Sequence, residues 1–125
     1  MATMSETHYL PMDMMATSRI ATYAEFWPYY LREHARPGTR AWHYLGTTLA
    51  LACVIAALLL AEPWFLAAMV VLGYGPAWIG HWMVEKNRPA TFRHPLWSLL
   101  SDFRLYAAWL SGSLLRELAK AGIEP

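Results

Sequence analysis

The residues of this sequence that could do chemistry lie beside two long apolar stretches. His34 lies ahead of the first stretch, His43 near its start and His81 near the end of the second, with Glu85 four residues later. Neutral imidazoles and a carboxylate are ligands for Fe(II), Zn(II) or Mn(II). Two histidines and one carboxylate with open positions are typical of oxygen-activating iron sites, whereas three or four histidines suit zinc equally. The set predicts a metal site and leaves the metal open.

Each of these residues also has an ordinary interpretation. Histidines near a membrane surface often cap helices or make hydrogen bonds. We interpret His94 as a loop residue, with an additional metal ligand as the alternative, and Asp102 as the partner of a nearby arginine, with orientation of a metal-bound imidazole as the alternative. The surrounding cations suffice as determinants of membrane topology, or could hold a lipid head group or carboxylate: Arg40, Lys86, Arg88 and Arg93.

Two uncharged runs must position the histidines. Residues 41–61 and 63–84 contain no charged side chain, and each run is long enough as a helix to cross a hydrocarbon core of about 30 Å. Because almost nothing separates them, they predict an antiparallel transmembrane hairpin. Gly73, Gly75 and Pro76 predict a locally weak or kinked second helix, which neighbouring helices can support.

The predicted hairpin places the candidate metal ligands at the same membrane depth. His43 precedes the tip by about 20 residues and His81 follows it by about 19, so both lie roughly 28–30 Å from the tip. A Pro-Gly break after His34 allows the preceding segment to fold back toward them. Glu85, at i+4 from His81, shares its helical face. Three histidines and one carboxylate are therefore expected to converge at one end of a small bundle.

Two further helices flank the hairpin. Residues 18–35 carry aromatic side chains at helical spacing, with Pro28 as a kink or the start of a second piece. Residues 96–115 carry a second apolar stripe, which we expect to be interfacial or packed on the hairpin. The expected fold is an all-α helical membrane protein, with a flexible leader at 1–17, a single helical membrane domain at 18–118 and a tail at 119–125.

Composition agrees with a membrane environment. Hydrophobic residues make up 57% of the 125 residues and charged residues 15%, against roughly 25% charged in an average soluble domain. A net charge of +1 without a basic stripe gives no indication of a nucleic-acid partner, and the single cysteine, Cys53, excludes a disulfide framework. Basic residues on both sides of the hairpin, and none at its tip, predict that both termini and the histidines are cytoplasmic.

Two segments resemble a known family. YYLREHARPGTRAWHYLGT and GYGPAWIGHWMVEKNRPATF are similar to the small membrane family that contains the fungal 2-hydroxy fatty-acid dioxygenase. The resemblance covers about residues 25 to 110 and includes a Gly-His-x-x-x-Glu-x-x-x-Pro-Ala motif, here Gly80-His81, Glu85 and Pro89-Ala90. The chain looks like a compact, bacterial-type member, which implies the bacterial inner membrane.

The resemblance implies an Fe(II)-dependent dioxygenase that uses O₂ to shorten 2-hydroxy fatty acids by one carbon among the membrane lipids. It implies iron ligation by His34, His43 and His81, with Glu85 as a fourth ligand or as a base. Arg88 or Arg40 would then neutralise the carboxylate of the lipid-like substrate. Three alternatives stay open at this point: a non-catalytic membrane scaffold or assembly protein, a zinc-dependent lipid hydrolase and a soluble helical bundle.

Overall fold

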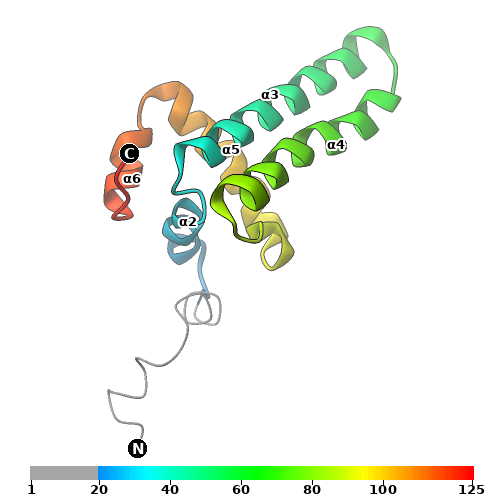
Figure 1. The fold of residues 1–125 in the computed structure, drawn as a ribbon. Coiled ribbons are helices and arrows are strands. Elements are labelled where there is room, and N and C mark those ends of the chain that lie inside the picture. The colour runs from blue at the N-terminus through cyan, green and yellow to red at the C-terminus, as the bar shows by residue number, and fades with distance from the viewer. Residues whose placement is uncertain (1–19) are drawn as a thin grey trace, which may run out of the picture.

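The computed structural model describes residues 20–125, so the predicted leader at 1–17 lies outside the described part of the chain. Within that part every regular element is helical, which confirms the all-α class (Figure 1). The elements in chain order are α2 (Tyr23–Arg32), α3 (Pro37–Leu60), α4 (Trp64–Ile79), the π-helix η2 (Gly80–Glu85), the 3₁₀-helix η3 (Ala90–Phe92), α5 (Pro95–Ser111) and α6 (Leu114–Lys120).

Helices α3 and α4 form a helical hairpin and lie side by side along its length (Figure 1). Ala61, in the left-handed conformation with φ 53°, ends α3 and starts the reversal. The helices approach closely because small residues face each other: a Cβ added to Gly46 would lie only 2.4 Å from the carbonyl oxygen of Gly73. Gly73, Gly75 and Pro76 do not interrupt α4, whose regular geometry instead gives way to a π-helix at Gly80.

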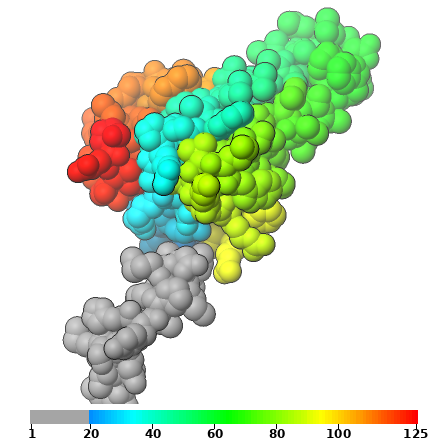
Figure 2. All heavy atoms as spheres, viewed as in Figure 1, coloured from blue at the N-terminus to red at the C-terminus, as the bar shows by residue number. Residues whose placement is uncertain are grey.

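The two helices of the hairpin differ in length. The 24 residues of α3 span about 36 Å, and among the described residues it is the one helix long and apolar enough to cross a membrane. The 16 residues of α4 span about 24 Å before the π-helix begins. Towards the tip, large apolar side chains are exposed, as Leu59 (79%) and Val71 (69%) illustrate. Figure 2 shows this end of the hairpin standing clear of the remaining helices.

The aromatic core lies at the opposite end, where α2 packs against α5 and α6. Phe26, Tyr30, Leu105 and Leu118 are almost completely buried there. The predicted helix 18–35 is shorter than expected but runs through Pro28. The predicted helix 96–115 is split because Gly112, at φ 81°, takes the left-handed conformation that ends α5. The end of α2, the start of α3 and η2 meet where this core joins the hairpin.

Candidate metal centre

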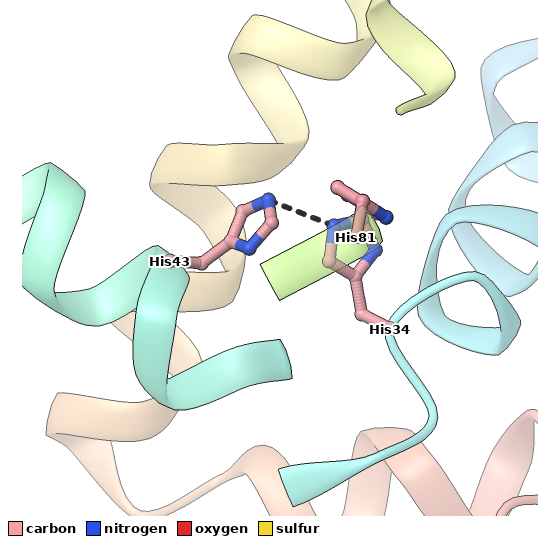
Figure 3. A group of neighbouring side chains, drawn as sticks. All are labelled: His34, His43 and His81. Carbon is pink, nitrogen blue, oxygen red and sulfur yellow. Dashed lines mark hydrogen bonds between the residues drawn. The ribbon is translucent and has the colours of Figure 1, made fainter. Parts of the chain in front are cut away.

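Three imidazoles face one another at this junction (Figure 3). The ring centroid of His34 lies 4.3 Å from that of His43 and 4.4 Å from that of His81, and the centroids of His43 and His81 are 5.0 Å apart. One nitrogen of each ring lies within 4.8 Å of the other two, and all three side chains are buried. The structure therefore brings together the three histidines that the hairpin geometry predicted to converge.

Two of the rings are oriented by their own helices. His34 Nδ1 lies 2.6 Å from the carbonyl oxygen of Tyr30, and His43 Nδ1 lies 3.1 Å from that of Thr39. Each partner is four residues earlier in the chain. Because a carbonyl oxygen only accepts hydrogen bonds, both Nδ1 atoms are assigned the hydrogen in the neutral rings. The Nε2 lone pairs of both rings are thereby left for a ligand.

The third ring is oriented by Asn87. The side-chain oxygen of Asn87 lies 2.6 Å from His81 Nδ1, while its amide nitrogen donates to the carbonyl (2.9 Å) and the carboxylate of Glu33. These acceptors fix the amide orientation, so His81 also carries its hydrogen on Nδ1. The chain places Asn87 here because Lys86 takes φ 63° and Asn87 N–H then donates to the His81 carbonyl. Asn87 and Glu33 were not predicted from the sequence, because no spacing rule singles them out.

The arrangement leaves nitrogen lone pairs facing each other. His34 Nε2 and His43 Nε2 are 2.9 Å apart, yet neither neutral ring has a hydrogen to place between them. Burial, together with the neighbouring His43 and His81, lowers the pKa of His34 well below its usual range, so protonation does not resolve the contact at neutral pH. A cation would accept these lone pairs, and three imidazoles are a donor set that fits Fe(II) or Zn(II).

The Asp102 carboxylate lies beside one of the histidines. Its Oδ1 accepts a hydrogen bond from the Tyr30 hydroxyl and lies 3.9 Å from His43 Nε2. Burial raises the pKa of Asp102 to about 7, while the hydrogen bond from Tyr30 opposes that rise. Among the described residues, the ionisable side chain within 4 Å of this carboxylate is the neutral His43 and not the arginine we expected. Asp102 is thus placed to orient a ligand or to contribute one oxygen.

Glu85 lies at a different position from the one expected. Its carboxylate accepts hydrogen bonds from Ala35 N (3.0 Å), Arg36 N (3.1 Å) and Thr39 Oγ1 (2.8 Å). It thereby caps the start of α3, whose own first residues offer no side-chain cap. A negative charge is favourable at a helix N-terminus. The group of mutually close ligand atoms in residues 20–125 contains the three histidines and not Glu85.

Arg40 is turned toward the backbone of the same linker. It is 5% exposed, and its Nη1 donates to the carbonyl oxygens of His34 (2.9 Å) and Ala35 (2.8 Å). Glu85 thus binds N–H groups of the short segment between His34 and His43, and Arg40 binds its C=O groups. Both residues therefore act on the positions of the histidines through the backbone.

The remaining candidates lie apart from the three histidines. Arg88 is exposed, with its guanidinium carbon 5.7 Å from the centre of the Phe92 ring. The His94 ring stacks on Trp97 and meets the edge of Phe26, and it is not part of the close group. This agrees with our interpretation of His94 as a loop residue. Among the described residues, Arg88 makes no hydrogen bond or ion pair with the three histidines, so a role for it depends on the substrate.

Comparison with known proteins gives one family. Residues 20–114 match the family described as "Mpo1-like: 2-hydroxy-palmitic acid dioxygenase Mpo1-like". The matched segment begins just before α2, ends at the start of α6 and includes all three histidines. Neither the curated proteins nor the solved structures include a match.

Proposed function

Because the chain belongs to the family of Mpo1-like 2-hydroxy-palmitic acid dioxygenases, we propose that it is an Fe(II)-dependent dioxygenase of 2-hydroxy fatty acids. The observation that carries this proposal is the set of three buried imidazoles, each of which places one ring nitrogen within 4.8 Å of the other two. The reaction R–CH(OH)–COOH + O₂ → R–COOH + CO₂ + H₂O shortens the acid by one carbon. It balances with O₂ as the sole oxidant, so no separate reductant is required.

In this proposal His34, His43 and His81 hold the metal through Nε2. Fe(II) bound there supplies redox chemistry toward O₂ and coordination positions for the substrate's hydroxyl and carboxylate oxygens. Asp102, beside His43 and hydrogen-bonded to Tyr30, is placed to accept the proton of the substrate hydroxyl at Oδ1. Glu85 contributes by capping α3, and Arg88 stays a candidate partner for the substrate carboxylate.

We place the hairpin in a membrane, with the histidines at its cytoplasmic side. The support is the length and apolarity of α3, the exposed apolar side chains near the tip and the basic residues at the opposite end. The predicted result is that the protein stays with membranes after a high-salt wash. Release into the soluble fraction by that wash would contradict this placement.

The test of function starts with metal. Detergent-purified protein, loaded anaerobically with Fe(II), should retain about one iron per chain, and His43→Ala and His81→Ala should retain none. His94→Ala is the matched control and should retain iron, because His94 lies outside the close group. The iron-loaded protein should then consume O₂ with 2-hydroxypalmitate and release the acid one carbon shorter.

Two outcomes would overturn the proposal. The first is that wild-type protein keeps no stoichiometric Fe(II). The second is that Zn(II)-loaded protein cleaves a lipid without consuming O₂, which would favour the hydrolase that three histidines also suit.

A further inference from the structure

A cavity adjoins the metal centre. It lies between α3, α4 and α5, has a volume of about 390 Å³ and is lined almost entirely by apolar side chains. Pockets that bind small molecules commonly measure about 300–1,000 Å³. Asp102 is the one charged residue in its lining, so a ligand of this cavity is apolar over most of its length.

The cavity shares two lining residues with the histidine site. Tyr74 and Asp102 line both this cavity and the small space of about 10 Å³ that the three histidines border. Asp102 also lies 3.9 Å from His43 Nε2. The inner end of the cavity is therefore polar and adjoins the metal centre, while the rest is apolar. Such a combination fits an amphiphile whose polar end is at the histidines.

The cavity runs along the hairpin and opens sideways. Met69 and Val70, at its far end, precede His81 by 12 and 11 residues, which corresponds to about 17 Å along a helix. Val70, Leu99 and Phe103 are 52%, 44% and 47% exposed, so the lining reaches the outer surface of the helices. An apolar ligand can thus enter laterally from the surroundings of the hairpin rather than through the buried histidine site.

We propose that this groove binds the acyl chain of the substrate and that Val70, at its outer end, limits the chain length. The inference rests on the proposed function and adds to it a specificity-determining residue and a lateral route of entry. Each methylene buried in the groove strengthens binding by about fourfold. A bulky side chain at Val70 would displace the last methylenes of a long chain and leave a short chain unaffected.

The kinetic test compares two substitutions on α4. Val70→Trp should lower the ratio of kcat/KM for 2-hydroxypalmitate to that for 2-hydroxydecanoate by about tenfold or more, as expected if two or more methylenes are displaced. Val71→Trp is the matched control: Val71 is also exposed, does not line the groove and should leave the ratio within about twofold. Equal ratios in wild type and Val70→Trp would overturn the proposal.

A second measurement does not depend on turnover. A 2-hydroxypalmitate carrying a terminal diazirine, photolysed on the detergent-purified protein, should label Met69 or Val70 and not Val71. Labels spread equally over the outer face of the hairpin would overturn the groove even if the enzyme oxidises the acid. Labels confined to the groove in a protein that never consumes O₂ would instead support the groove and overturn the proposed reaction.

Discussion

Replacement of Glu85 by glutamine tests whether this residue is a metal ligand or a helix cap. The Glu85 carboxylate accepts three hydrogen bonds, two at Oε2 (from Arg36 N and Thr39 Oγ1) and one at Oε1 (from Ala35 N). The glutamine oxygen can replace only one of these atoms, and the amide group then opposes a backbone donor. The substitution also removes the negative charge from the N-terminus of α3.

The magnitude follows from these losses. A hydrogen bond to a charged group contributes about 1.5–3 kcal/mol, and the interaction with the helix dipole contributes about 0.3–1 kcal/mol. We therefore expect Glu85→Gln to lower the free energy of unfolding by about 2–3 kcal/mol. Because the capped linker joins His34 to His43, the metal affinity should fall by about 10- to 100-fold, the range found when groups that orient ligands are changed.

The assay measures iron per chain over a series of Fe(II) concentrations, together with thermal unfolding of the metal-free protein. At saturating Fe(II), Glu85→Gln should still bind about one iron, whereas His81→Ala should bind none at any concentration. Glu62→Gln, an exposed glutamate near the hairpin tip, is the matched control and should change neither quantity. Loss of stoichiometric iron from Glu85→Gln at saturation would refute the cap and restore Glu85 as a ligand.

Three further predictions follow from the same geometry. Asn87→Leu removes the acceptor that holds His81 Nδ1 and should weaken metal binding by about 10- to 100-fold in a metal titration; unchanged affinity would show that His81 needs no such partner. In the metal-free protein the pKa of His34 is lowered, so the unfolded chain binds a proton at His34 before the folded protein does, and stability is lost as the pH falls below about 6.5. The pKa of Asp102 is raised from 3.8 to about 7, so between these values the folded protein binds the Asp102 proton first. Protonation of Asp102 therefore stabilises the fold as the pH falls and offsets part of that loss. Asp102→Asn should therefore make the Tm fall more steeply than in wild type between pH 6.5 and 5, and parallel curves would contradict this assignment. Gly46→Ala should destabilise the hairpin by about 1–3 kcal/mol, because its Cβ would lie 2.4 Å from the Gly73 oxygen, whereas Gly75→Ala, with no atom within 4 Å, should be neutral or stabilising in the same melting experiment.

The positions of some site residues could not be predicted from the sequence, because they depend on contacts with residues far away in the chain. The two carboxylates illustrate the point: Glu85 was expected beside His81 from α-helical i, i+4 spacing, but the segment 80–85 is a π-helix and the carboxylate reaches the linker before α3 instead. Asp102 was expected beside an arginine and lies beside His43, because the packing of α2 and α5 places Tyr30 against it. No local pattern predicts contacts between side chains 50 or 70 residues apart.

The sequence by itself determined the helical class, the hairpin and the common level of His43 and His81. Runs 41–61 and 63–84 lack charge, so they form long helices, and the short reversal between them sets the register of whatever lies at their far ends. Hydropathy and residue count are local properties that survive in any packing. Only the tertiary structure decided which oxygen lies beside each Nδ1, and hence which ring nitrogens are left for a metal. A hydrogen-bond partner is fixed by the simultaneous positions of α2, α3, η2 and the loop after it.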